Sequence, residues 1–330
     1  MPIAKRTVLI LGAGASQHLG YPIGEDLLFK IAGLSTDNNG MSFVYELETV
    51  GKLPRKFPFH TGTIDNFLYD IQFATEYYSS IDAYLEHNEN YVSVGKWLIA
   101  RELTKYEITP RVINPGWYRV LFRALFGHIP VDKPPTIARN LSIITYNYDR
   151  SLEQYLHWTI IKTFGFHSMW TTIDPGAMPR AEAAFKAIPI VHVHGLLGNY
   201  PAVRYSPKLD HRELLAISRK INIINEMQDA SDGFCNNEYR RAYRLLEEAD
   251  RIIFAGFGFF SDNIKRLRFF ATDAARTKEI HASIWHQSKL VEERMMREAV
   301  DCGVQGSDCH FYRHTTCDDL FANHVDLTSS

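Results

Sequence analysis

Four short stretches of the sequence carry residue types that can bind an anion, orient a substrate or move a proton. They read "GAGAS" from Gly12, "TYNYD" from Thr145, "VHVHG" from Val191 and "GFGFFSDN" from Gly256. Each stretch follows or ends a short apolar run. If these runs are parallel strands of one sheet, the four stretches meet at its carboxyl edge, where open α/β sheets bind their ligands.

The first stretch is suited to binding a phosphate group. Gly12 and Gly14 have no side chain to keep a phosphate away from the backbone, and a helix starting here would turn free N–H groups toward the anion. Ser16 adds a hydroxyl donor. The dehydrogenase fingerprint requires glycine where this chain has Gln17, and no strand ending in an acidic residue follows about twenty residues later. The stretch therefore disfavours a dehydrogenase.

The second and third stretches place polar side chains at the ends of two further predicted strands. Thr145, Asn147 and Asp149 are the polar positions of "TYNYD", and the alternative for Asp149 is a simple helix cap. His192 and His194 are expected on the same face of a strand, with His194 at its carboxyl end. An imidazole titrates near neutrality and can take a proton from a hydroxyl or a water. The alternative for His194 is an ordinary core or turn residue, and His192 is interpreted as structural.

The fourth stretch combines two glycines with short polar side chains. Gly256 and Gly258 allow the backbone to approach a ligand closely, and Ser261, Asp262 and Asn263 offer hydrogen-bonding groups. The alternative is a turn softened by glycine, with Ser261 or Asp262 capping the helix that follows. The two interpretations are compatible with each other.

Six short apolar runs are the predicted strands, and amphipathic stretches alternate with them. The strands are predicted at 7–12, 141–146, 188–195, 251–258, 279–286 and 309–314. The predicted helices include 64–85, 91–106, 116–126, 210–228, 237–249 and 264–275, and Asp210 and Glu213 have the spacing of a capping box. Several strands are almost continuously apolar, as in parallel sheets covered on both faces. The sequence thus predicts an α/β fold with a doubly wound, Rossmann-like parallel sheet of about six strands.

One connection in this scheme is unusually long. Roughly a hundred residues separate the first predicted strand from the second, whereas a crossover needs only ~10–12. We therefore expect an α-helical module at 35–136, inserted into a sheet domain formed by 1–34 and 137–330. Such a module could cover a cofactor cleft, and a helical cap that serves only stability or oligomerisation is the alternative.

Composition excludes several classes of protein. The 330 residues are 45% hydrophobic and 22% charged with a net charge of −2, so no global field favours a polyanion, and we expect no direct nucleic-acid binding. Only Val8 to Leu11 are strongly apolar before two glycines, too short a run for a secretion signal, and no run approaches the ~18 residues of a membrane span. The four cysteines form no CxxC pair, which suits a reducing compartment. We expect a cytoplasmic protein without a membrane association.

The order and spacing of the four stretches resemble the motifs of the sirtuin (SIR2) family. The first resembles the cofactor motif G-A-G-x-S-x-x-x-G-x-P, which here extends to Gly20 and Pro22. "TYNYD" resembles T-Q-N-x-D with Tyr146 in place of glutamine, and "VHVHG" resembles the catalytic His-Gly. "GFGFFSDN" resembles the adenosine-binding turn of bacterial SIR2-like domains. The chain therefore resembles the divergent bacterial SIR2-like type that is associated with defence against phage.

This resemblance implies that NAD+ is bound as a substrate, and it implies roles for individual residues. The diphosphate would lie on the first stretch, Asn147 would contact the nicotinamide ribose and place the attacking water, Asp149 would recognise the carboxamide, and His194 would remove a proton. The implied catalytic residues are thus Asn147, Asp149 and His194. The implied NAD+-binding residues are Gly12, Ala13, Gly14, Ala15, Ser16, Pro22, Thr145, Asn147, Asp149, Gly256, Gly258, Ser261, Asp262 and Asn263.

Two departures from the sirtuin pattern bear on the reaction. Sirtuin deacylases continue with Asp-Phe-Arg after the proline, where this chain has Ile23-Gly24-Glu25, and they hold a zinc ion with two CxxC pairs that this chain lacks. We therefore expect no zinc and predict an NAD+ hydrolase that releases nicotinamide and ADP-ribose. A deacylase, an ADP-ribosyltransferase and a non-catalytic NAD+- or ADP-ribose-binding scaffold are the alternatives. A C-terminal set of possible ligands matches no familiar zinc module: Cys302, Cys309, His310, His314 and Cys317.

The resemblance also implies control of the activity, because unregulated loss of NAD+ would kill the host. The chain ends soon after its last predicted strand, which leaves no room for a sensor domain of ~100 residues. We therefore expect a homo-oligomer and a separately encoded defence partner, such as a HerA-like DNA-translocase ATPase or an Argonaute-like protein.

Overall fold

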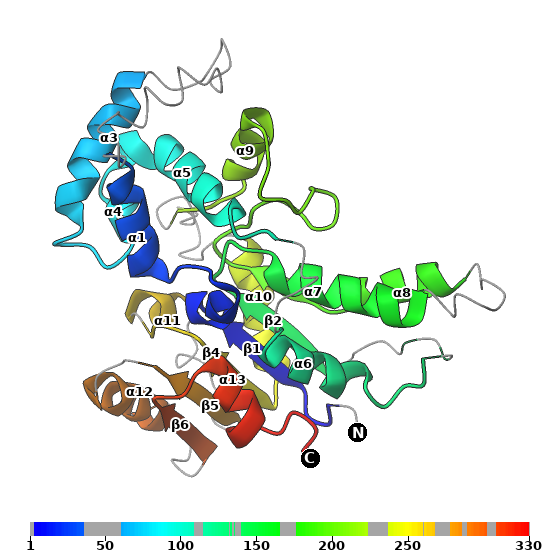
Figure 1. Ribbon diagram of the computed structural model, residues 1–330. Helices are drawn as coiled ribbons and strands as arrows, with labels where there is room; N and C mark the ends of the chain where they lie inside the picture. The colour runs from blue at the N-terminus through cyan, green and yellow to red at the C-terminus, as the bar shows by residue number, and fades with distance from the viewer. Residues whose placement is uncertain are drawn as a thin grey trace.

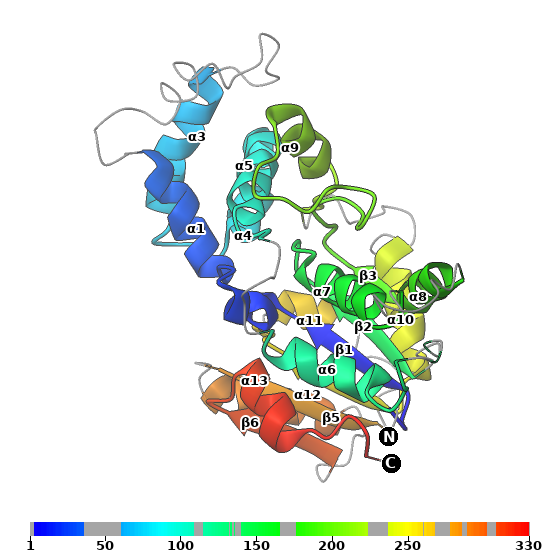
Figure 2. The ribbon, with the colours of Figure 1, turned by 45° about the vertical axis from the view of Figure 1, so that its right-hand side comes forward.

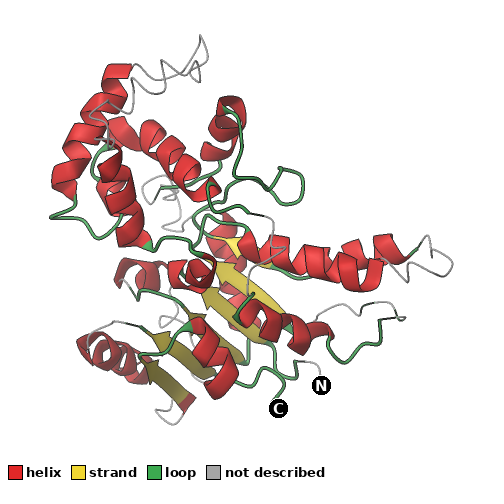
Figure 3. Cartoon of the chain, viewed as in Figure 1, coloured by secondary structure: helices red, strands yellow, loops and turns green. Residues whose placement is uncertain are grey.

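The computed structural model describes residues 3–35, 61–108, 115–131, 133, 135, 140–165, 176–223, 237–259, 261–267, 278–285, 289–301 and 308–329. Within these ranges, six parallel strands form one sheet in the order β3-β2-β1-β4-β5-β6 (Figures 1 and 3). The strands are β1 (Thr7–Leu11), β2 (Leu141–Thr145), β3 (Ile190–His192), β4 (Arg251–Ala255), β5 (Glu279–Ile284) and β6 (Cys309–Arg313). Each lies inside a predicted run, so the doubly wound α/β fold is confirmed.

Helices cover both faces of the sheet, which explains why its central strands are apolar throughout. Along β1, Leu9 and Leu11 face one side and Val8 and Ile10 the other. The first side packs against α6 (Trp117–Phe126), α7 (Ser151–Ile160), α8 (Ala177–Lys186) and the C-terminal α13 (Cys317–Asp319) with η8 (Leu320–His324). The second side packs against α10 (Asn237–Glu248), α11 (Ser261–Leu267) and α12 (Lys289–Asp301) (Figure 2).

A third cluster of buried residues belongs to a group of helices that we call the helical layer. It comprises α1 (Gly24–Ala32), α3 (Thr61–Ala74), α4 (Ile81–Glu86), α5 (Val92–Thr104) and α9 (His211–Ser218). Tyr148 and Leu197, which follow β2 and β3, belong to the same cluster. The helical layer therefore lies at the carboxyl edge of the sheet (Figure 1).

The helical layer does not coincide with the predicted helical module at 35–136. Helix α6 lies inside the range 35–136 and yet packs on the sheet through Trp117 and Leu121, whereas α1 and α9 lie outside that range and pack in the helical layer. The division of the chain into two domains at these boundaries stays a prediction. No helix that the structure describes is long and apolar enough to span a membrane.

Several predicted helices are shorter than their periodicity suggested. The range 64–85 contains two helices, because α3 ends at Ala74 and Ser80 starts α4 by accepting the Ala83 N–H at 3.2 Å. Helix α9 has the predicted capping box of Asp210 and Glu213 but ends at Ser218. The end of the predicted helix 210–228 and most of 264–275 lie outside the described residues.

The turn after β1 also differs from the expected strand-to-helix turn. Ala13–Leu19 form a 3-10 helix, η1, and α1 begins only at Gly24. Gly20 ends η1 with a φ of 85°, a conformation that favours glycine. The first stretch thus leads into a short tight helix rather than into the amino end of an α-helix.

Candidate functional site

The order of the strands reverses between β1 and β4, and three glycines meet there. A Cβ atom on Gly12 would lie 2.5 Å from the carbonyl oxygen of Gly256, and a Cβ on Gly256 would lie 2.1 Å from the nitrogen of Ala15. The Gly14 N–H donates to the Gly256 carbonyl at 3.0 Å, and Gly256 has a φ of 60°. These glycines are therefore needed for the contact between the two turns, whatever ligand they also approach.

The first stretch uses part of its backbone within the protein. Besides the Gly14 N–H, the Ala15 N–H donates to the Gly12 carbonyl at 2.9 Å. The Ala15 carbonyl accepts from the indole nitrogen of Trp117 on α6, also at 2.9 Å. The conformation of the stretch is thus fixed by neighbouring elements, and two of the amides predicted to face a phosphate already have acceptors.

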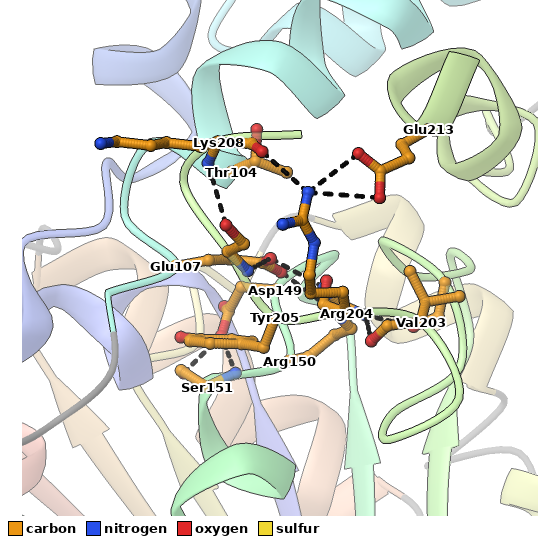
Figure 4. Close-up of polar contacts among 12 residues, drawn as sticks. Thr104, Glu107, Asp149, Arg150, Ser151, Val203, Arg204, Tyr205, Lys208 and Glu213 are labelled. Atoms are coloured by element: carbon orange, nitrogen blue, oxygen red, sulfur yellow. Dashed lines mark hydrogen bonds and ion pairs between the residues drawn. The ribbon is translucent and has the colours of Figure 1, made fainter. Parts of the chain in front are cut away.

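Asp149 lies at the centre of a buried hydrogen-bond network. The Ser16 hydroxyl donates to its Oδ2 at 2.8 Å. Its Oδ1 accepts from both the N–H and the hydroxyl of Ser151 (Figure 4). The Tyr118 hydroxyl of α6 lies 2.7 Å from the Ser151 hydroxyl. Burial raises the pKa of Asp149, and the bonds from Ser151 and Ser16 oppose that rise. Asp149 therefore stabilises the start of α7 and holds Ser16 at the same time.

The orientation of the Asn147 amide follows from this network. Because the single hydroxyl proton of Ser16 points to Asp149, the Ser16 oxygen can only accept from Asn147, whose Nδ2 lies 3.3 Å away. The amide oxygen Oδ1 then faces away from Ser16, and it is buried without a hydrogen-bond partner in the described structure. A buried acceptor without a donor costs about 1–3 kcal/mol, so Oδ1 marks a place where a ligand could donate.

His192 holds the backbone of Asn147 from one face of the sheet. Its Nδ1 donates to the Asn147 carbonyl at 2.9 Å, and its Nε2 lies 2.5 Å from Oε1 of Glu153 on α7. Burial alone would lower the pKa of His192, but the Glu153 carboxylate and the two hydrogen bonds raise it overall. His192 is thus a positioning group for Asn147, in agreement with its interpretation as structural.

His194 points to the opposite face, so the prediction that both histidines share one face was wrong. Its Nε2 lies 3.3 Å from the Tyr239 hydroxyl of α10, whereas His192 contacts α7. The alternation fails because β3 ends at His192 and the chain turns at Gly195, where φ is 75°. Burial lowers the pKa of His194 to about 3, with a contribution from the charge of Arg266. His194 is therefore a neutral imidazole at physiological pH.

Sequence reasoning missed a buried ion pair directly beside Asp149. Arg150 donates from Nε and Nη2 to Glu107 at 2.9 and 2.7 Å, and both side chains are completely buried (Figure 4). Arg150 also donates to the carbonyls of Val203 and Arg204, so it anchors this loop next to the site. Burial raises the pKa of Glu107 to about 7 against the opposing charge of Arg150. No spacing rule could reveal the pair, because its members lie 43 positions apart.

The remaining predicted residues lie around this centre. Thr145 is buried and accepts the Asn147 N–H at 3.0 Å, and Pro22 is buried next to η1. In the fourth stretch, the Asn263 carbonyl accepts from the Tyr146 hydroxyl at 3.0 Å, which brings the start of α11 to the end of β2. The ring of Tyr146 also contacts the edge of His194, with centroids 4.9 Å apart. The side chains of Ser261 and Asp262 lie outside the described residues.

The possible metal ligands do not converge where the structure describes them. Cys309 packs with the Val8 side of the sheet and Cys317 with the Leu9 side, so the sheet separates the two thiols. Among the described residues, no group of three or more histidine, cysteine or acidic side chains is placed to hold a metal ion. Cys302 lies outside the described residues.

A surface hollow of about 800 Å³ lies away from this centre. It is lined by α6 residues such as Arg123, by His128 just after α6, and by the C-terminal segment from Phe321 to Thr328. The Asp326 carbonyl in this segment accepts from Arg251, the first residue of β4, which places the hollow toward the amino edge of the sheet. None of the predicted site residues lines it.

The fold and site define the class of the protein as a Rossmann-like α/β domain with polar side chains gathered at the carboxyl edge of its sheet. The family model of the SIR2-like domain matches residues 141–304. This match supports the SIR2-like family for the chain, and with it an NAD-related activity. It includes Asn147, Asp149, His194 and the fourth stretch, while the glycines of the first stretch precede it. A comparison with curated proteins found no match.

Proposed function

We propose that the protein is an NAD+ hydrolase that cleaves the bond between nicotinamide and ribose, yielding nicotinamide and ADP-ribose. The observation that carries the proposal is the buried Oδ1 of Asn147, which has no partner in the described structure. The neutral imidazole of His194 follows β3, the parallel neighbour of the strand that Asn147 follows. A ribose hydroxyl is a donor that such an acceptor can bind. The SIR2-like match supports NAD+ as the molecule that brings this ribose.

The reaction requires stabilisation of a positively charged sugar and delivery of a water. Nicotinamide leaves as a neutral molecule with the electron pair of its bond to C1′, and the water oxygen forms the new bond to that carbon. Asn147 would hold the ribose and the water in place, which contributes through orientation. His194 would accept the proton of the attacking water and pass it to solvent. Its imidazole is neutral, as a base must be, and its pKa of about 3 makes it a weak base.

Asp149 and the first stretch complete the proposed site. Asp149 would recognise the nicotinamide carboxamide, whose N–H would join or replace the donors from Ser16 and Ser151. The diphosphate would lie near Gly12 to Ser16. No zinc ion takes part in the proposed reaction.

We test the assignment with the purified full chain and the candidate partners present. Wild-type protein should convert NAD+ to nicotinamide and ADP-ribose, measured by chromatography, whereas Asn147→Ala and His194→Ala should abolish conversion. His128→Ala, an exposed histidine in the distant hollow, is the matched control and should keep wild-type turnover. Undiminished turnover in both site variants would contradict the assignment. Label transferred to protein, or release that depends on acyl-lysine, would favour the transferase or deacylase alternatives.

The biological role follows from the chemistry. An enzyme that removes NAD+ stops the metabolism of the cell that contains it, so its action suits abortive defence against phage. The proposed effector acts in the cytoplasm, as an oligomer or together with a separately encoded partner that detects the invader.

A further inference from the structure

The guanidinium of Arg266 on α11 lies between the carboxyl edge of the sheet and the helical layer. Its Nη2 is 3.5 Å from Oε1 of Glu86 on α4, and only 17% of its side chain is exposed. One turn earlier on α11, Asn263 accepts from Tyr146, and the ring of Tyr146 contacts His194. Arg266 is close enough to His194 for its charge to contribute to the lowered pKa of that imidazole.

The hydrogen bonding of this guanidinium is incomplete. Its Nη1 is buried without a partner among the residues that the structure describes. Its separation from Glu86 exceeds the ~2.7–2.9 Å of a close charge-assisted hydrogen bond. By contrast, the buried Arg150 binds Glu107 through two nitrogens, and Arg251 binds Glu279 at 3.0 Å together with C-terminal carbonyls. Arg266 therefore has donors available at the site, unlike these two arginines.

From this geometry we infer that Arg266 binds the diphosphate of the substrate. The inference rests on the proposed function, because the diphosphate is the anionic part of NAD+. The planar fork of a guanidinium matches two phosphate oxygens, and charge-assisted bonds of this kind are stronger than neutral ones.

Among the groups that the structure describes around Asn147 and the first stretch, the others do not supply this charge. The Gly14 and Ala15 amides donate within the protein, His194 is neutral, and Arg150 already donates to Glu107 and to loop carbonyls. The first stretch, Gly12 to Ser16, contains no cationic side chain. Arg266 thus complements the backbone of the first stretch in binding the anion.

Glu86 competes with the diphosphate for the same guanidinium. When substrate binds, phosphate oxygens take over donors that face Glu86 in the structure, so ligand binding weakens a contact between α11 and α4. Removing the Glu86 charge should therefore strengthen binding of a diphosphate, whereas removing the Arg266 charge should weaken it. These opposite signs distinguish a ligand-binding role from a purely structural ion pair, in which both changes would only destabilise the fold.

The test is calorimetric titration of the full chain with ADP-ribose, which retains the diphosphate and needs no turnover. Arg266→Gln should raise the Kd by about tenfold or more, Arg266→Lys should raise it less, and Glu86→Gln should lower it. Arg241→Gln on α10, which removes an exposed arginine paired with Glu238 at 2.8 Å, is the control and should leave the Kd unchanged. Thermal unfolding of each variant verifies that it is folded, and Arg266→Lys preserves the charge if the glutamine variant does not fold.

The possible failures separate the two proposals. If wild-type protein binds ADP-ribose and Arg266→Gln binds it equally well, the role of Arg266 is wrong while the proposed function stands. If wild-type protein binds neither ADP-ribose nor NAD+, with the candidate partners present or absent, both proposals are overturned.

Discussion

At the scale of single residues, one hydroxyl determines the geometry of two predicted site residues. Ser16 donates to Asp149 and accepts from Asn147. Both partners follow β2, whereas Ser16 follows β1. The direction of that one proton leaves Oδ1 of Asn147 as the acceptor available to a ligand. Ser16 is therefore a positioning residue for Asn147, besides any contact that it makes with a phosphate.

Replacing Ser16 by alanine should lower turnover without unfolding the protein. The Asn147 amide loses the acceptor that holds it, and a misplacement of this size can cost about 10- to 100-fold in kcat. The measurement is NAD+ hydrolysis under activating conditions, with thermal unfolding in parallel. Ser218→Ala is the matched control, since it removes a buried hydroxyl that bonds to the Leu215 carbonyl of its own helix, α9. Equal turnover of Ser16→Ala and the control would show that Ser16 positions nothing.

The pair of His192 and Glu153 should make the stability of the protein depend on pH. The folded-state pKa of His192 is raised above 6.5, so its stabilisation is fully present below that pH and is lost as the pH rises through the folded value. We expect the difference in unfolding free energy between wild type and His192→Gln to be larger near about pH 6 than near about pH 9. Denaturant unfolding at both pH values measures this difference in unfolding free energy. A difference that grows as the pH rises would contradict a charged pair.

The effect of His194 on stability has the opposite sign. Its pKa is lowered to about 3, so the stability associated with the neutral imidazole falls as the pH drops below about 6.5, where the unfolded chain takes up the proton. The comparison for His192 is therefore made above about pH 6, where the folded state keeps His194 neutral.

The site residues that could be predicted are those that directly follow a predicted strand. Asn147, Asp149 and His194 directly follow strands of one parallel sheet, so their position at its carboxyl edge could be predicted, while their roles stay a prediction. The Asp149 network through Ser151 and Tyr118 was missed, as was Glu107, the partner of Arg150, because these are ordinary residue types at unremarkable spacings. The direction of His194 was wrong because periodicity cannot tell that β3 ends after three residues.

At the scale of elements, the turns after β1 and β4 form one unit. Gly12, Gly14 and Gly256 approach so closely that a side chain on any of them would collide with the facing backbone. Motifs far apart in the sequence thus depend on each other for their conformation. This mutual dependence is a second reason for glycine at positions that suggested phosphate binding.

Gly256→Ala should disturb this unit and reduce ligand binding. The new Cβ would meet the Ala15 nitrogen at 2.1 Å, and the residue would keep a φ of 60°, so we expect a loss of stability of about 1–3 kcal/mol and weaker ADP-ribose binding. Gly33→Ala is the matched control, because no atom lies within 4 Å of its added Cβ. With its φ of −69°, that variant should be neutral or slightly more stable. Calorimetry measures the stability and the ADP-ribose binding of both variants. Unchanged binding by Gly256→Ala would mean that the two turns act independently.

The strands and helices were predictable where the order of apolar and polar residues along the sequence shows which positions are buried. All six strands appeared as apolar runs, because a parallel sheet covered on both faces requires them. Helix ends were less predictable, since a local cap at Ser80 interrupts a periodic pattern that continues across it. The 3-10 form of η1 left no signal, because it results from packing against the turn after β4 and against Trp117.

At the scale of the whole molecule, side-chain pairs within the described residues join α4 and the segment after α5 to residues beside the site. Asp82 accepts from Tyr148, Glu86 pairs with Arg266, and Glu107 in the segment after α5 pairs with Arg150. Each contact joins a helix or segment of the long connection after β1 to a residue that follows β2 or β4. A shift of the helical layer would therefore act on the ends of both strands at once.

The proposed enzyme should consequently be silent when isolated and dilute, and active after assembly. In the described structure Asp149 is engaged by Ser16 and Ser151, so binding of the carboxamide requires an exchange of hydrogen bonds that assembly could favour through the helical layer. We expect NAD+ hydrolysis per protomer to rise with protein concentration or on addition of the defence partner. Light scattering at the same concentrations relates the rise to oligomer size. Asn147→Ala treated identically should stay inactive, and full specific activity of the wild type at the lowest concentration, without a partner, would refute control by assembly.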